Sequence, residues 1–313
     1  MSWRSDMKQK LVECIPNFSE GRRPEVIEAI VCTIQAVTGV LVLNSSSDPD
    51  HNRSVVTFVG TPEAVGEAAF RAIHIASTLI DLDSHQGTHP RLGATDVVPF
   101  VPLAGATMEE CVEMARQVGK RVGDELGIPV YLYEAAATRP ERARLEHVRK
   151  GEYEALKVSI SKDPERAPDY GPMKVGSAGA TIIGARHPLV AFNVYLTTDD
   201  IKIAQKIART IRASSGGFPH VKALGMLVDG RAQVSMNFTN TSVTGLAPVI
   251  EAINREAEVV GVAIHHSELI GLISNSVLVD VATSYLQLEA FSLEQILEYR
   301  LSQVLDENTQ ILE

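Results

Sequence analysis

Apolar, often β-branched runs of strand length alternate along this chain with longer segments that begin with helix start signals. In the first half, this pattern predicts strands at residues 10–15, 40–45, 54–60, 96–101 and 129–133, and helices at 24–37, 61–79 and 107–126. Thr107 and Glu110 have the spacing of a helix capping box. Residues 138–161 are charged and helix-compatible, whereas 162–184 are rich in Pro, Gly and Asp and predict a linker or binding loop.

The second half repeats the pattern. It predicts strands at residues 189–196, 221–228, 232–239 and 262–269, and helices at 198–213, 242–260, 274–286 and 293–301. Asp229-Gly230 predicts a two-residue hairpin turn between the second and third of these strands. Residues 189–194 lack polar alternation, which predicts a central strand buried on both faces.

The order of elements predicts the fold class. The second half has the β-α-β-β-α-β order of a split βαβ unit, and the first half has the same order with an extra helix and strand. We therefore expect an α+β protein of two ferredoxin-like α/β-sandwich subdomains, residues 8–185 and 186–313. Ligand sites in such pairs usually lie in the cleft between domains, so we expect the active site there.

The amino-acid composition restricts the possible binding partners and the cellular location. The 313 residues are 45% apolar and 22% charged, as in globular proteins, and the net charge of −10 disfavours nucleic acid as a partner. It does not exclude small anionic substrates. No apolar run approaches the roughly 20 residues of a membrane span, and no apolar segment follows the basic N-terminus. Three cysteines far apart fit a cytoplasmic location.

The segment DLDSHQGTHPRLGATD, residues 81–96, contains the closest grouping of candidate catalytic and ligand-binding residues. His85 and His89 have the spacing of a helical metal pair, but Gly87 and Pro90 argue against a helix there. Three interpretations stay open from the residues alone. The histidines could serve as a general base in a rigid loop, or only satisfy loop hydrogen bonds. The third interpretation is a metal site, whose ligands would be Asp81, His85, His89 and Asp96.

Other polar segments give weaker signals. Arg53, next to Asn52, could bind a carboxylate, but spacing alone favours an ordinary β-turn with an exposed arginine. Residues 16–21, between a strand and a helix start, could form an anion site or a simple connection. Two Gly-rich loops, 171–179 and 214–222, would let a flat ligand approach the backbone. No nucleophile elbow or nucleotide-binding glycine motif is present.

Several long motifs together resemble one family. They are LVECIPNFSEGR (11–22), HNRSVVTFVG (51–60), DSHQGTHPRLGATDVVPFVP (83–102), VYLYEAA (130–136), GEYEAL (151–156), PDYGP (168–172) and VAFNVYL (190–196). They resemble the glutamate formimidoyltransferase family, whose domain also forms the N-terminal half of formiminotransferase-cyclodeaminase. The resemblance covers residues 10–303. Because no cyclodeaminase portion follows, we expect the single-function enzyme.

The resemblance implies a fold, a reaction and a base. The family consists of homodimers with paired ferredoxin-like subdomains. It transfers a formimidoyl group from N-formimidoyl-L-glutamate to N5 of tetrahydrofolate, the co-substrate, in histidine degradation, without a metal. The base in the family's HPR(L/M)GA motif matches His89, not His85. The family's folate-binding stretches match two sets of residues here: Gly171, Pro172, Lys174, Gly176, Ser177 and Gly179, and Gly216, Gly217, His220, Lys222 and Gly225. The first loop is one residue shorter than in the bifunctional enzyme, and the second differs in its basic residues.

Substrate roles follow from residue type and position rather than from the family. We assign Arg53 and Arg91 to substrate carboxylates, and Asn17 and Asn52 to orienting the formimidoyl nitrogen. Three other functions stay open. The first is a formyltransferase acting between glutamate and folate on the same site, and the second is a folate-binding protein without catalysis. The third is a metal-dependent hydrolase.

Overall fold

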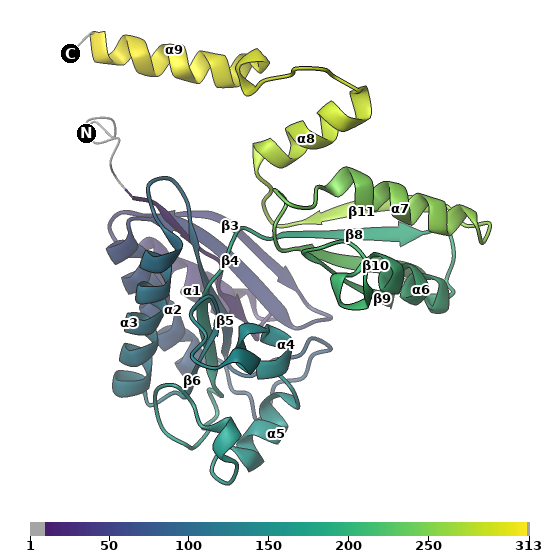
Figure 1. Ribbon diagram of the computed structural model, residues 1–313. Helices are drawn as coiled ribbons and strands as arrows, with labels where there is room; N and C mark the ends of the chain where they lie inside the picture. The colour runs from purple at the N-terminus through teal and green to yellow at the C-terminus, as the bar shows by residue number, and fades with distance from the viewer. Residues whose placement is uncertain (1–9, 312–313) are drawn as a thin grey trace. The chain divides into compact units, whose positions relative to one another are not determined.

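The chain divides into two compact units, Met1–His187 and Pro188–Glu313, each with its own sheet and core (Figure 1). The structure is a computed structural model that describes residues 10–311, with side chains described through residue 304. The basic N-terminal segment and the outer ends of the two predicted subdomains, residues 8–9 and 312–313, lie outside this range. No helix in the described range is both long and apolar enough to cross a membrane.

The sheet of the first unit has seven strands. They are β1 (Val12–Cys14), β2 (Asn17–Phe18), β3 (Val40–Asp48), β4 (Arg53–Gly60), β5 (Thr95–Pro102), β6 (Val130–Glu134) and β7 (Thr181–Ala185). Both β1 and β2 lie between β4 and β5, so they form one strand position that is interrupted at Ile15-Pro16. The spatial order is β3, β4, β1/β2, β5, β7, β6, with β7 parallel to both of its neighbours.

Three helices cover one face of this sheet: α1 (Pro24–Gln35), α2 (Pro62–Leu79) and α3 (Met108–Arg121) (Figure 1). The Thr107 hydroxyl accepts from the Glu110 backbone N–H while the Glu110 carboxylate accepts from the Thr107 N–H, which confirms the predicted capping box. Helix α3 continues as a π-helical turn, Val122–Leu126. The core holds fully buried phenylalanines of the sheet and isoleucines of the helices: Phe18, Phe58, Phe100, Ile30, Ile34 and Ile73.

The prediction of a loop throughout residues 162–184 is wrong at its end, because β7 begins at Thr181. All five residues of β7 are buried between β5 and β6. A parallel strand buried on both faces shows no polar alternation, and a Gly-rich segment precedes this one, so the pattern did not reveal it. Residues 138–161 form short helices, η2 (Pro140–Ala143), α4 (Leu145–Val148) and α5 (Glu152–Ser159), and η3 (Pro164–Arg166) follows them.

The second unit has a four-stranded antiparallel sheet. Its strands are β8 (Val190–Leu196), β9 (Val221–Val228), β10 (Arg231–Phe238) and β11 (Ile264–Ile270), in the spatial order β11, β8, β10, β9. Its helices are α6 (Ile201–Ile211), η4 (Ala213–Ser215), α7 (Leu246–Glu258), α8 (Asn275–Leu286), η5 (Leu293–Gln295) and α9 (Leu297–Ile311). Asp229 and Gly230 both have positive φ and join β9 to β10, which confirms the predicted hairpin.

Strand β8 is central, as predicted, but it is not buried on both faces. Ala191, Phe192 and Asn193 are only half-buried, although Val190 and residues 194–196 are buried. A central strand of an antiparallel sheet needs cover on only one face, and the Asn193 side chain extends to Glu268 on β11.

Ile182 tests the corrected assignment of β7. Its side chain is fully buried, so Ile182→Ala should lower the free energy of unfolding by about 2–5 kcal/mol, through lost burial and a residual cavity. Urea denaturation measures this change. Met173→Ala is the matched control, because Met173 belongs to the same predicted loop but is 45% exposed, and should change stability little. Equal, small effects of the two substitutions would contradict a buried β7.

Candidate active site

Residues 80–94, here called the His loop, connect α2 to β5 and lie against the first Gly-rich loop. Leu82 and Leu92 are buried and fix the loop to the core. The Leu82 N–H donates to the Ser177 carbonyl at 2.8 Å, and the Ala94 N–H donates to the Ala178 carbonyl at 2.8 Å. The structure therefore brings together two segments that the sequence places more than eighty residues apart.

The other side of the His loop contacts the turn between β3 and β4. Asn52, buried and with a positive φ of 49°, accepts from the Gly21 N–H and donates its amide to the Gln86 carbonyl, both at 2.9 Å. A side chain at Gly87 would place its Cβ 2.4 Å from the His51 carbonyl oxygen. Gly87 is therefore needed for this close approach. Asn52 holds the loop by these bonds, and its predicted role toward substrate stays a prediction.

His89 is held in one tautomer. Its Nδ1 lies 2.7 Å from the Pro90 carbonyl oxygen. Because a carbonyl can only accept, Nδ1 bears the proton, and a neutral ring then has its lone pair on Nε2. The ring is half-buried and meets the edge of the His51 ring at a centroid distance of 6.0 Å. This imidazole is arranged to accept a proton at Nε2.

Burial and neighbouring positive charges keep the His89 ring neutral. Burial, together with the guanidinium groups of Arg53 and Arg149, lowers the pKa of His89 from 6.5 to about 3, while Asp96 opposes the shift. Both burial and neighbouring positive charge disfavour the imidazolium form. The free base is therefore the dominant form at neutral pH.

His85 is bonded differently. Its Nε2 lies 3.0 Å from the Asn52 carbonyl oxygen and must donate, while its Nδ1 accepts from Arg91 Nε at 3.2 Å. Both ring nitrogens are therefore engaged. Burial lowers its pKa as well, and its one lone pair, on Nδ1, is already engaged by Arg91. The geometry assigns His85 to supporting the loop and leaves His89 as the candidate base.

A buried carboxylate lies beneath this site. Asp96, fully buried at the start of β5, accepts from Arg53 Nη1 at 2.7 Å and from Arg149 Nη2, and its other oxygen accepts from the Leu92 N–H at 2.9 Å. Arg53 also donates from Nε and Nη2 to Asn17 Oδ1, at 3.2 and 2.8 Å. The interpretation of Arg53 as an exposed turn residue is wrong, because its exposure is 9%. Burial lowers the pKa of Arg53 to about 10.

Arg91 is surrounded by the protein's own acceptors. Its guanidinium donates to Glu152 at 3.0 Å and to Glu154 at 2.6 and 3.0 Å, in addition to His85. Two carboxylates thus neutralise a single positive charge. A substrate carboxylate would have to compete with both, so the predicted role of Arg91 is not favoured by its surroundings.

The segment at residues 16–21 includes the short strand β2 and leads to α1, and the position where an anion would bind is already filled. The Glu20 carboxylate accepts from the N–H groups of Arg22 and Arg23, at 2.8 and 3.0 Å, beside the start of α1. These donors are the ones that would bind an external anion. The simple connection is therefore the better of the two interpretations.

The predicted folate residues fall into both compact units. In the first Gly-rich loop, Gly171, Pro172, Lys174, Gly176 and Ser177 are exposed, whereas Gly179, with φ of 73°, packs against the Leu92 carbonyl oxygen. The second loop belongs to the other unit. There Gly216, His220 and Lys222 are exposed and Gly217 is half-buried, but Gly225 lies on β9 under α6, where a Cβ would stand 2.3 Å from the Gln205 nitrogen. Gly225 thus has a packing role of its own.

Two family models match the chain. The formiminotransferase domain, N-terminal subdomain, matches residues 11–186, and the formiminotransferase domain matches residues 191–303. The chain belongs to the formiminotransferase family. The chain is 50% identical to a glutamate formimidoyltransferase of Streptococcus pyogenes serotype M1, over 93% of this chain and 99% of the relative. It is 48% identical to a glutamate formimidoyltransferase of Thermoplasma acidophilum, over 93% and 97%.

A bifunctional relative shows the same domain within a longer protein. The formimidoyltransferase-cyclodeaminase of Sus scrofa is 44% identical over 91% of this chain, and the match covers 54% of that relative. The chain therefore spans about half the length of the bifunctional protein, but nearly the full length of the two glutamate formimidoyltransferases.

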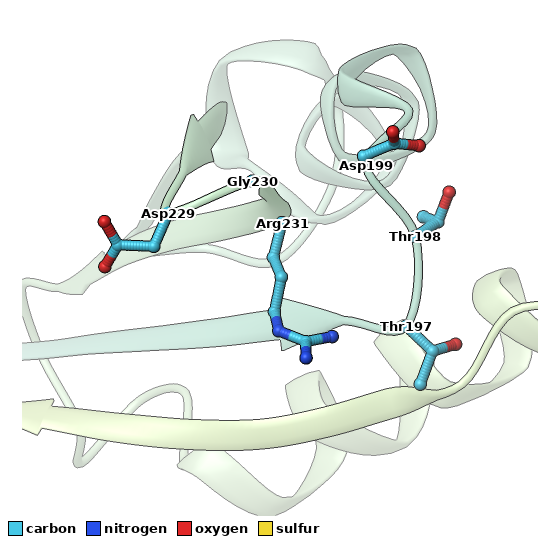
Figure 2. A pocket seen from close by; sticks show the side chains of 6 residues that line it. All are labelled: Thr197, Thr198, Asp199, Asp229, Gly230 and Arg231. Atoms are coloured by element: carbon cyan, nitrogen blue, oxygen red, sulfur yellow. The ribbon is translucent and has the colours of Figure 1, made fainter.

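One polar depression lies elsewhere, in the second unit. It measures about 450 Å³ and is lined by Thr197, Thr198, Asp199, Asp229, Gly230 and Arg231 (Figure 2). The Asp199 and Asp229 carboxylates and the Arg231 guanidinium do not converge on one point in this view. None of the predicted site residues lines the depression, so we do not assign it to the reaction.

The described residues include no group of three or more His, Cys, Asp or Glu arranged to hold a metal ion. In the set considered from the sequence, Asp96 is ion-paired with two arginines and both His85 nitrogens are engaged. Arg149 also belongs to this site, although the sequence did not predict it. It lies in the charged segment 138–161, where its only signal was a charge typical of a solvated helix.

The protonation state of His89 gives the first test of the site. The pKa of His89 falls from 6.5 to about 3 when the chain folds. As pH falls, the unfolded chain therefore takes up the proton first. The free energy of unfolding that His89 contributes is lost between pH 6.5 and about 3. In ¹⁵N NMR at pH 5, we expect a neutral ring with the proton on Nδ1. Under urea the same resonance, assigned with His89→Gln, should titrate near 6.5. A protonated ring in the folded protein at pH 5 would contradict this electrostatic account.

Asp96→Asn tests the buried ion pairs. It leaves two buried guanidinium groups with no carboxylate between them, so we expect unfolding free energy to fall by about 3–5 kcal/mol in urea denaturation. Asp83→Asn is the matched control, because Asp83 is exposed in its pairing with Lys157 and should affect stability far less. Similar losses for both variants would argue against a structural role for Asp96.

Proposed function

We propose that this chain transfers the formimidoyl group of N-formimidoyl-L-glutamate to N5 of tetrahydrofolate, with His89 as general base. The names of the two most similar relatives described above support the reaction. The observation that supports the base is the neutral His89 ring, whose Nδ1–H donates to the Pro90 carbonyl and whose Nε2 has the lone pair. Such a ring can take a proton without first losing one.

The reaction needs one proton to move. N5 of the folate attacks the formimidoyl carbon, and His89 Nε2 accepts the N5 proton as the N5–carbon bond forms. The tetrahedral intermediate then breaks its bond to the glutamate nitrogen, which receives the proton, and L-glutamate leaves. No covalent enzyme intermediate or metal is required. A positioned base contributes about 10²- to 10⁴-fold, and holding both substrates in attack geometry supplies much of the rest.

The remaining assignments are part of the same proposal. The strand orders of both units support ferredoxin-like subdomains: β11-β8-β10-β9 in the second, and β5, β1/β2, β4, β3 as the corresponding set in the first. Residues 8–185 and 186–313 would then be the N- and C-terminal subdomains. The cytoplasmic location, the homodimer, and the binding of one folate by both Gly-rich loops stay predictions. Arg53 and Asn17, which bind each other, are better placed to order the site than to contact substrate freely.

Substitution of each histidine separates catalysis from support. We expect His89→Ala to fold and bind tetrahydrofolate but to lose about 10²- to 10⁴-fold in kcat, because the base is gone. His85→Ala should retain much more turnover. Steady-state assays with N-formimidoyl- and N-formyl-L-glutamate, and folate binding by fluorescence, measure these effects.

The same assay discriminates between the functions left open by the sequence. Near wild-type turnover by His89→Ala would overturn the base assignment. Preference of the wild-type protein for the formyl donor would replace the reaction by formyl transfer, and tight folate binding without turnover of either donor would leave a binding protein.

A further inference from the structure

The charges beneath His89 do not balance. Asp96 contributes one negative charge, whereas Arg53 and Arg149 contribute two positive ones. Among the residues that the structure describes, neither arginine is paired with a second carboxylate. With the His89 ring neutral, the cluster holds a surplus positive charge, and repulsion from Arg149 contributes to the lowered pKa of Arg53.

Arg149 has an unused donor. Its side chain is 14% exposed, and its Nε is buried without a hydrogen-bond partner in the described structure. A buried N–H without an acceptor is unfavourable, and most such groups in native proteins have a partner. The backbone at Arg149 is itself fixed, because its N–H donates to the Leu145 carbonyl and its carbonyl accepts from the Glu152 N–H. The guanidinium is held as well, because its Nη2 donates to Asp96, so the unsatisfied Nε–H stays beside the buried ion pair.

Arg91, in the His loop, has the opposite balance of charge around it. Arg91 is enclosed by Glu152 and Glu154, which give its surroundings an excess of negative charge. A substrate carboxylate is therefore repelled by the two glutamates around Arg91 and attracted by the surplus positive charge of Arg53 and Arg149. Of that pair, Arg53 already uses Nε and both terminal nitrogens. Arg149 is therefore the arginine with a donor left for a ligand.

We propose that Arg149 binds a carboxylate of the glutamate donor through the N–H groups of its guanidinium that the protein leaves unused, beside His89, and so determines donor affinity. This inference rests on the proposed function, since the donor must be an anion that reaches the His89 ring. N-formimidoyl-L-glutamate offers two carboxylates, one of which would supply both an acceptor for Arg149 and a negative charge that balances the surplus positive one.

Binding of the glutamate donor at Arg149 would then change the pKa of His89. The charged or titratable groups that face the His89 ring are Arg53 on β4, Asp96 on β5, Arg149 after α4, and His51 in the turn before β4. A carboxylate bound to Arg149 cancels the surplus positive charge among them. The pKa of His89 rises toward neutrality as a result, so the ring becomes a stronger base when the donor is present.

Arg149→Met tests the inference, because it removes the donor and the charge but keeps an unbranched side chain. We expect the KM for N-formimidoyl-L-glutamate to rise roughly 10- to 100-fold, the loss expected for one charge-assisted hydrogen bond, with tetrahydrofolate binding unchanged. Arg144→Met is the matched control, because Arg144 is exposed in the same segment, and it should keep the wild-type KM. An unchanged donor KM in Arg149→Met would overturn the proposal.

A second measurement does not depend on turnover. In ¹⁵N NMR of the wild-type protein, saturating L-glutamate should raise the pKa of His89, and in Arg149→Met it should not. If Arg149→Met fails to fold, Arg149→Lys decides: a raised donor KM supports the proposal, and a wild-type KM overturns it. Absence of transferase activity in the wild-type protein would instead refute the proposed function, while a glutamate-dependent shift at His89 would still support Arg149 as an anion site.

Discussion

The Asp96 carboxylate, buried between two guanidinium groups, is the interaction on which the site depends. It joins Arg53 on β4, Arg149 after α4 and the Leu92 backbone at the end of the His loop, so three separate parts of the first unit are fixed to one point. A buried ion of this kind is tolerated only when its lone pairs are satisfied, and both oxygens of Asp96 are. The same cluster sets the charge that His89 experiences.

Hydrogen-bond direction distinguishes the two histidines, where spacing in the sequence does not. Each ring faces a backbone carbonyl, but His89 faces it with Nδ1 and His85 with Nε2. His85 then gives its remaining nitrogen to Arg91, whereas His89 keeps a lone pair at Nε2. Two chemically identical side chains four residues apart thus differ in which ring nitrogen has a free lone pair, because their neighbours differ.

Local signals in the sequence were sufficient for much of the fold. The capping box at Thr107 and the turn at Asp229-Gly230 depend on residues next to each other, and both are confirmed. Strand β7 was missed, because its burial comes from β5 and β6, distant in the chain. The site divides in the same way: His89 lies in a recognisable motif, but the pairing of Arg149 with Asp96 spans 53 residues and has no sequence pattern.

The central claim is that His89 Nε2 receives the N5 proton, and a structure of the protein with a tetrahydrofolate analogue and L-glutamate tests it most directly. The account predicts N5 of the pterin within about 3 Å of Nε2, the range of a hydrogen bond, with Nδ1 still on the Pro90 carbonyl. A folate bound with N5 far from His89, or next to another base, would contradict it.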